Sequence, residues 1–138
     1  MTASAPVATD ARCPCCSGDL YGLCCGPAHS GTRPAPTAEA LMRSRFSAFA
    51  VGDADYLRAS WHVSTRPADL DLDPDLEWWR LDILGTTAGG PFDDAGTVEF
   101  VAHYRDPAVA GREGRGKMQE LSRFVREGGR WYYVDAAG

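Results

Sequence analysis

The sequence predicts an α+β fold in which two helices precede a curved antiparallel sheet. Apolar residues recur at helical spacing from residue 38 to residue 61, and they alternate with a period of two after residue 76. Helices followed by a run of strands are typical of α+β domains, so we expect the sheet to fold around the helices. All five cysteines lie ahead of both, between positions 13 and 25, which indicates a separate small module at this end of the chain.

The cysteine cluster predicts a metal site. Disulfides that hold a fold together are spread along the chain, whereas here no cysteine occurs after position 25. Two pairs, Cys13-x-Cys15 and Cys24-Cys25, are separated by eight residues. Four thiolates complete the closed tetrahedral site that zinc occupies in structural roles. We therefore expect one zinc ion bound by Cys13, Cys15, Cys24 and Cys25.

Several alternatives stay open for this cluster. The cysteines could pack as buried free thiols, or hold an iron–sulfur cluster, although their spacing differs from the common ferredoxin runs. Cys16, the fifth thiol, is a spare, an alternate ligand or a redox-labile residue, and His29 is a further candidate to replace a thiolate. An all-thiolate site leaves no open position for water, so we do not expect catalysis at the metal.

Composition divides the chain into a tail, a knuckle and a main domain. Residues 1–11 are small and polar without periodicity, and we expect them to be disordered. The predicted zinc knuckle covers residues 12–30, and a connector rich in glycine and proline follows at 31–36. The main α+β domain is predicted over residues 37–138, with the connector separating its core from the knuckle.

Capping residues mark both predicted helices. Thr37 is expected to cap a helix over residues 38–51, and Gly52 fits the position at which such a helix ends. Asp53 is expected to cap a second, shorter helix that carries Tyr56 and Leu57 and ends at Trp61 and His62.

Four segments with alternating apolar residues are the predicted strands: 76–84, 97–105, 118–126 and 131–135. Gly128-Gly129 suits a type I′ turn between the last two, because that turn needs positive φ at both central positions. The register implied by this turn places Phe124 opposite Tyr133 and Ser122 opposite Asp135. One face of the hairpin would then carry Glu120, Ser122, Phe124, Trp131, Tyr133 and Asp135.

The space between the helices and the sheet is the candidate for a second site. Its predicted lining comprises Arg45, Trp61, His62, Glu120, Ser122, Tyr133 and Asp135. One interpretation is a small-molecule cavity with His62 or Asp135 as an acid or base. The other is a buried ion pair between Arg45 and Glu120 or Asp135. Because buried charges are normally paired, the ion pair is the favoured interpretation.

Motifs in the sequence resemble those of two known protein families. The segment Cys13-Pro14-Cys15-x-Ser17-Gly18-x-x-Tyr21-x-x-Cys24-Cys25-Gly26 resembles the SEC-C motif, a zinc module found at the C-terminus of the SecA translocation ATPase and implicated in binding SecB and ribosomes. This chain lacks the lysines that usually flank the aromatic residue of that motif. The remainder resembles the YchJ-like family of small bacterial proteins, in the stretches 41–46, 53–57, 61–62, 122–124 and 131–135. That resemblance implies a nuclear transport factor 2-like (NTF2-like) cone of helices and curved sheet, with no established activity.

Charge and composition narrow the function. A formal charge of −5 disfavours nucleic acid as a partner, and no apolar run is long enough to span a membrane. The N-terminus lacks the features of a signal peptide, so we expect a cytoplasmic protein. We predict a zinc-binding adaptor, linked by resemblance to secretion or ribosomes, whose partner surface includes Leu20 and Tyr21. The alternative is a small-molecule binder or enzyme using the cavity; we expect no hydrolytic or isomerase activity from the chain alone.

Overall fold

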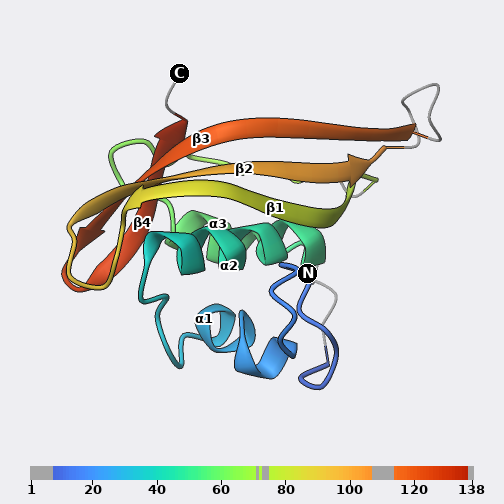
Figure 1. Ribbon diagram of the computed structural model, residues 1–138, viewed down its shortest axis with the longest axis horizontal. Coiled ribbons are helices and arrows are strands. Elements are labelled where there is room, and N and C mark those ends of the chain that lie inside the picture. The colour runs from blue at the N-terminus through green and yellow to red at the C-terminus, as the bar shows by residue number, and fades with distance from the viewer. Residues whose placement is uncertain (1–7, 71, 73–74, 107–113, 137–138) are drawn as a thin grey trace.

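The computed structural model describes residues 8–70, 72, 75–106 and 114–136. Its four strands form one antiparallel sheet in the order β1-β2-β3-β4, which confirms the predicted α+β class. The chain is arranged in three layers: the curved sheet, then helices α2 and α3 against its inner face, then the N-terminal knuckle on the far side of α2 (Figure 1). The elements are η1 (Tyr21–Leu23), α1 (Gly26–Ser30), α2 (Ala38–Val51), α3 (Ala54–Ala59), β1 (Glu77–Ala88), β2 (Ala95–Arg105), β3 (Arg115–Glu127) and β4 (Arg130–Ala136).

The first helix of the main domain has its predicted bounds because its ends are set locally. The Thr37 hydroxyl accepts a hydrogen bond from the backbone N–H of Ala40, at 3.0 Å, and Gly52 takes the left-handed conformation at φ 78°. Asp53 caps α3 in the same way, through the N–H of Tyr56. None of the helices in the described part of the chain has the length and apolar character needed to cross a bilayer.

Helix α3 is shorter than predicted. It ends at Ala59, so the prediction that Trp61 and His62 belong to it is wrong. Instead, the chain after α3 runs beside β4: the N–H of His62 donates to the carbonyl of Tyr133, and the N–H of Tyr133 donates to the carbonyl of Ser60. These two bonds, each 2.8 Å long, hold the end of α3 against the last strand.

The core lies between α2 and the sheet. Apolar side chains on one face of α2 meet the inner face of all four strands, and burial of such surface supplies most of the stability of a domain this size. The buried set is Ala38, Leu41, Met42, Phe46, Leu81, Val98, Phe100, Ala102, Phe124 and Trp131.

The β3–β4 hairpin follows the predicted register only in part. Gly128 and Gly129 both have positive φ, and Phe124 lies opposite Tyr133 as predicted. Beyond that pair the register shifts, and Asp135 lies opposite Arg123. An extra residue in one strand moves the following side chain to the other face. The prediction that Asp135 shares the inner face is therefore wrong; its carboxylate accepts a hydrogen bond from Arg123 Nε at 2.6 Å.

The end of the predicted disordered tail is ordered in the structure. The N–H of Tyr21 donates to the carbonyl of Ala11, at 2.8 Å, and the N–H of Gly22 donates to the carbonyl of Thr9, at 2.9 Å. The prediction of disorder is wrong for these residues, which form part of the knuckle. Residues 1–7 lie outside the described residues.

Candidate metal centre and ligand cavity

The four predicted ligand cysteines meet at one point. Their sulfur atoms all lie within 4.8 Å of one another, and three of the four residues are buried. Cys15 Sγ is 3.5 Å from Cys24 Sγ, which is 3.9 Å from Cys25 Sγ. A tetrahedral ion with metal–sulfur bonds of about 2.3 Å needs sulfurs about 3.8 Å apart. The cluster therefore has the dimensions to hold a metal ion.

Local backbone structure aims these sulfurs inward. The N–H of Cys16 donates to the carbonyl of Cys13, and positive φ at Cys16 and Gly18 turns the chain back. Hydrogen bonds, first of all from Cys15, lower the pKa of Cys13, whereas burial raises the pKa of Cys24 to about 11. Because metal ligands are deprotonated, an ion at the centre would displace the protons that the crowded thiols otherwise retain.

The two alternative ligands lie outside the group of four. The side chain of Cys16 is exposed, and its sulfur is 3.9 Å from the carbonyl oxygen of Trp79. Both nitrogens of His29 are engaged elsewhere: Nδ1 is 2.7 Å from the hydroxyl of Tyr21, and Nε2 is 2.8 Å from the carbonyl of Ser44. A carbonyl only accepts hydrogen bonds, so Nε2 carries the proton that it donates to Ser44. His29 is a connector between knuckle and helix, and the hypothesis that it binds the metal is wrong.

Further contacts attach the knuckle to α2. Arg43 Nη1 donates to the carbonyl of Cys15 at 3.0 Å, and Cys13 Sγ lies 3.5 Å from the hydroxyl of Ser47. No sequence pattern predicts these contacts, because they join residues that are 28 and 34 positions apart. The connector separates the knuckle from the core along the chain, but the two are in direct contact through α2.

The two residues predicted as a partner surface differ in exposure. Leu20 is 44% exposed. Tyr21 is half-buried, packs against the cysteine cluster and bonds to His29, so its role in the structure is internal to the knuckle. The neighbouring Leu23, on the same predicted loop, is 71% exposed.

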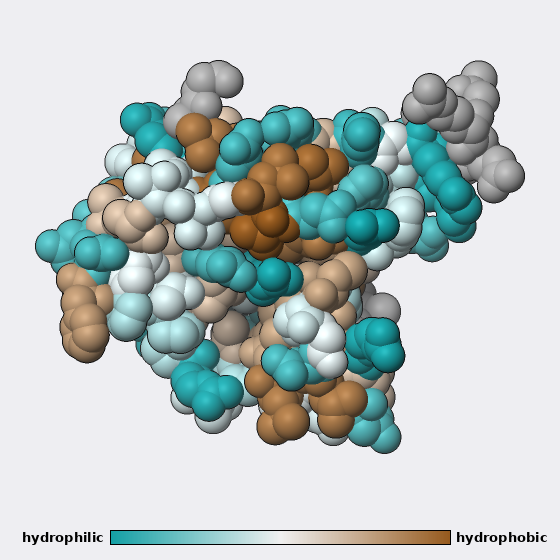
Figure 2. All heavy atoms as spheres, viewed as in Figure 1, coloured by the Kyte–Doolittle hydropathy of each residue, from teal (hydrophilic) through white to brown (hydrophobic). Residues whose placement is uncertain are grey.

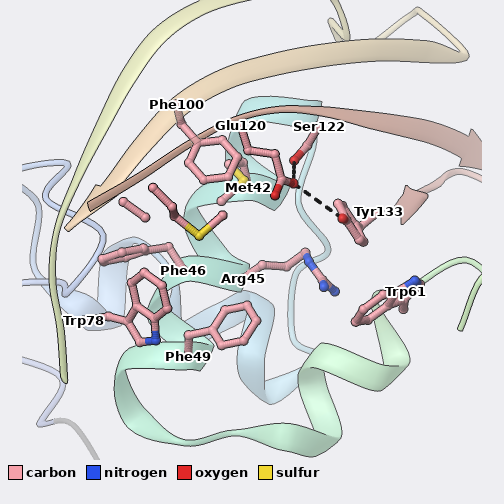
Figure 3. Close-up of a pocket in the computed structure, with 12 residues that line it drawn as sticks. Met42, Arg45, Phe46, Phe49, Trp61, Trp78, Phe100, Glu120, Ser122 and Tyr133 are labelled. Carbon is pink, nitrogen blue, oxygen red and sulfur yellow. Dashed lines mark hydrogen bonds between the residues drawn. The ribbon is translucent and has the colours of Figure 1, made fainter. Parts of the chain in front are cut away.

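A cavity of about 140 Å³, here called the α2–sheet cavity, lies between α2 and the inner face of the sheet (Figure 3). It brings together five of the seven predicted residues: Arg45, Trp61, Glu120, Ser122 and Tyr133. The remaining lining residues come from the predicted helix and strands, and no sequence pattern indicates that they border an open space. They are Met42, Phe46, Phe49, Trp78, Phe100, Ala102 and Met118.

His62 and Asp135 do not line this cavity, so the prediction is wrong for both. His62 Nε2 lies 2.9 Å from a carboxylate oxygen of Glu127, and its Nδ1 lies 2.7 Å from the hydroxyl of Ser64. Asp135 pairs with Arg123 on the outer face, and that ion pair lowers the pKa of the Asp135 carboxyl group.

Arg45 is buried as predicted, but the predicted ion pair with Glu120 or Asp135 is absent. Its Nη1 donates to the carbonyl of Leu57 at 2.8 Å and to the hydroxyl of Ser60 at 2.7 Å. The guanidinium carbon lies 4.5 Å from the ring centre of Tyr133, a cation–π contact. Burial lowers the pKa of Arg45 to about 10, which leaves it cationic at neutral pH.

Glu120 is held by its neighbours on the sheet. One carboxylate oxygen accepts hydrogen bonds from the hydroxyl of Ser122, at 2.6 Å, and from that of Tyr133, at 3.5 Å. Burial raises the pKa of Tyr133 to about 12, so the phenol keeps the proton that it donates. The cavity thus presents a cation from α2 and a carboxylate from β3, joined by apolar walls.

A family model and several known proteins match this chain. The family model "YchJ, middle NTF2-like domain" matches residues 37–136. The UPF0225 protein CE1570 of Corynebacterium efficiens is 52% identical over 128 residues, which cover 93% of this chain and 94% of that protein. A UPF0225 protein of Streptomyces avermitilis is 51% identical, covering 91% of this chain and 83% of its own.

Two solved structures share the fold over most of the chain. The SEC-C motif-containing protein RPA3114 of Rhodopseudomonas palustris superposes with a TM-score of 0.78 at 34% identity, covering 92% of this chain and 98% of that one. A SEC-C motif-containing protein of Psychrobacter arcticus superposes with a TM-score of 0.74 at 27% identity, covering 92% and 82%. These matches confirm both resemblances inferred from the motifs. The chain therefore belongs to the YchJ family of UPF0225 proteins, with an NTF2-like domain and a SEC-C motif ahead of it.

Proposed function

We propose that this protein binds a small molecule in the α2–sheet cavity, on a scaffold that structural zinc holds together. The observation that carries the proposal is Arg45, a cation that is only 4% exposed, lines an apolar cavity and has no ion-pair partner among the described residues. A buried charge without a counterion is costly, and binding sites are where such groups are retained.

The cavity has the other properties of a ligand site. Ligand sites are concave, mostly apolar, and contain a few fixed polar groups that orient the ligand. Here the bonds from Arg45 to the end of α3 fix the guanidinium, and those from Ser122 and Tyr133 fix the Glu120 carboxylate. Polar groups held in this way lose little conformational entropy when a ligand binds.

Tryptophan side chains provide the test. Trp61 and Trp78 line the cavity, whereas Trp79 and Trp131 do not. In a screen of cavity-sized fragments of varied charge, we expect the indole N–H resonances of the first two to shift on binding, while those of the second two stay in place. A screen in which no fragment shifts the indole N–H resonance of Trp61 or Trp78 would contradict the proposal.

For the metal centre we propose one zinc ion held by Cys13, Cys15, Cys24 and Cys25. The all-sulfur donor set and the sulfur separations suit tetrahedral zinc, which would order the knuckle and fix it on α2. Thiolates of this kind stay reduced in the cytoplasm, where we propose that the protein works.

A second candidate function is docking of a protein partner on the knuckle. Leu20 and Leu23 are 44% and 71% exposed on a module that the metal would hold rigid, and apolar side chains gather at this end of the molecule (Figure 2). Rigid apolar anchors are typical of binding hot spots. In this second candidate function the protein is an adaptor, and its partner would be a component of secretion or of ribosomes.

Photo-cross-linking in growing bacteria tests the adaptor role. With the cross-linking residue at position 23, we expect a discrete adduct that Leu20→Ser weakens while zinc content is kept, because the two leucines form one surface. The matched control places the same residue at Phe92, which is 92% exposed on the loop between β1 and β2. Equal adducts from both positions, or none from position 23, would argue against a knuckle partner.

A further inference from the structure

Part of the hydrogen-bonding capacity of Arg45 is left unused inside the α2–sheet cavity. Its hydrogen bonds to the described residues all leave from Nη1. Among those residues, every side-chain nitrogen or oxygen that is inaccessible to solvent has a hydrogen-bond partner. Nε and Nη2 of Arg45 have no such partner, so they must keep some solvent-accessible surface. Because Arg45 is only 4% exposed and lines the cavity, that surface faces the cavity.

We infer that the cavity binds a small cyclic monocarboxylate whose carboxylate pairs with the Nε and Nη2 groups of Arg45. The inference rests on the ligand-binding function proposed above and assigns the chemical class of the ligand. A guanidinium presents its N–H groups as a planar fork, and a carboxylate matches that fork with two parallel hydrogen bonds. Figure 3 shows the guanidinium of Arg45 directed toward Trp61 and Tyr133, at the side of the cavity away from Phe46 and Trp78.

The size and walls of the cavity specify the rest of the ligand. Its volume of about 140 Å³ is close to that of an apolar cavity of roughly 150 Å³ that holds one benzene molecule. Phe46 and Phe49 stand at 6.3 and 6.0 Å from the ring of Trp78, in edge-on and tilted arrangements. Walls built of ring edges and faces favour a flat six-membered ring as the apolar body of the ligand.

Glu120 limits the ligand to one negative charge. Its carboxylate lines the same cavity as Arg45, so a ligand paired with Arg45 would also face Glu120. A second anionic group would be repelled by Glu120, whereas a hydroxyl or amino group on the ring can donate a hydrogen bond to it. This arrangement distinguishes a monocarboxylate from a dicarboxylate or a phosphate dianion.

Three probes of similar size test the assignment on the full-length zinc-loaded chain. Benzoate carries one carboxylate, benzyl alcohol carries none and phthalate carries two. Titrations are followed by the indole N–H shifts of Trp61 and Trp78, with Trp79 and Trp131 as internal references. We expect benzoate to bind at least about tenfold more tightly than benzyl alcohol, because hydrogen bonds to charged groups are the stronger ones. Phthalate should bind more weakly than benzoate.

Variants then assign the preference to one residue. Arg45→Met should bring the ratio of the two dissociation constants close to one, and Arg45→Lys should restore part of it, because the charge returns without the fork. Arg58→Met, at an exposed arginine of α3, should leave the ratio unchanged.

The outcomes separate this inference from the function on which it rests. If benzyl alcohol binds in the cavity as tightly as benzoate, the carboxylate assignment is overturned while ligand binding stands. If neither probe shifts the indole N–H resonances of Trp61 or Trp78 but other fragments do, the assigned ligand class is wrong. If no fragment of any charge moves them, both proposals fail. The comparison of probes on the unmodified chain decides the matter even if Arg45→Met does not fold.

Discussion

Replacing Cys24 and Cys25 with serine is expected to abolish metal binding and unfold the knuckle, while the sheet and α2 remain folded. Structural zinc supplies about 10–16 kcal/mol of apparent binding free energy in small zinc modules at pH 7, and that energy is their folding energy. Metal analysis under reducing conditions should give about one zinc per unmodified chain and none for the double variant, since four thiolates fill one tetrahedral site.

The same variant should also destabilise the main domain, because the knuckle is in contact with α2. Loss of the hydrogen bonds from His29 to Ser44 and from Arg43 to Cys15 removes two interactions of this kind. At about 1 kcal/mol each, they correspond to a fall in Tm on the order of 10 °C.

The control for both effects is Cys16→Ser. Cys16 is exposed and lies outside the group of four sulfurs, so this variant should keep one zinc and its melting temperature. Loss of zinc from Cys16→Ser would show that the fifth thiol is a ligand. Loss of the whole cooperative melt from the double variant would show that knuckle and domain fold as one unit.

Phe46→Ala is expected to lower the free energy of unfolding by about 3–5 kcal/mol, which is the range for truncating a buried phenylalanine. Phe46 is 2% exposed and lies in the core that joins α2 to the sheet. Its ring stands edge-on to Trp78 at 6.3 Å. The loss corresponds to a fall in Tm of roughly 15–25 °C for a domain of about 100 residues.

Phe49→Ala is the matched control, since it removes the same atoms one turn further along α2. Phe49 is only half-buried, and its ring is 6.0 Å from that of Trp78. We expect the free energy of unfolding to fall by about 1–2 kcal/mol, because Phe49 buries less apolar surface on folding than Phe46 does. Urea denaturation monitored by tryptophan fluorescence measures both variants. Equal losses for the two would mean that α2 is rotated relative to the sheet.

Local signals explain what could be predicted in the main domain. The bounds of α2 follow from Thr37 and Gly52, whose side-chain and backbone chemistry acts within one helical turn. The turn at Gly128-Gly129 follows from its need for positive φ, and it sets the register as far as Phe124 opposite Tyr133. Each of these features depends on neighbours in the chain, so a single sequence is enough to place them.

The register shift beyond Tyr133 shows where such signals end. No residue pattern announces that Asp135 moves to the outer face, because the shift occurs where β4 pairs with the segment after α3. The same contact carries Ser60 to Arg45, from a position 15 residues away, and replaces the expected ion pair with a carbonyl and a hydroxyl. A pairing of this kind depends on how three elements pack together, which no window of sequence contains.

Residue types and spacing were enough to predict the cluster of four cysteines, the α+β order, both helix caps and five residues of the cavity. They were enough because metal ligation, capping and alternation require particular residue types at short, regular spacings. Two features became visible only in the folded chain: the knuckle lies on α2 through His29 and Arg43, and Arg45 has no ion-pair partner among the described residues although it lines a cavity. Those features arise from packing between segments far apart in the chain, where many side chains of similar chemistry compete for the same partner.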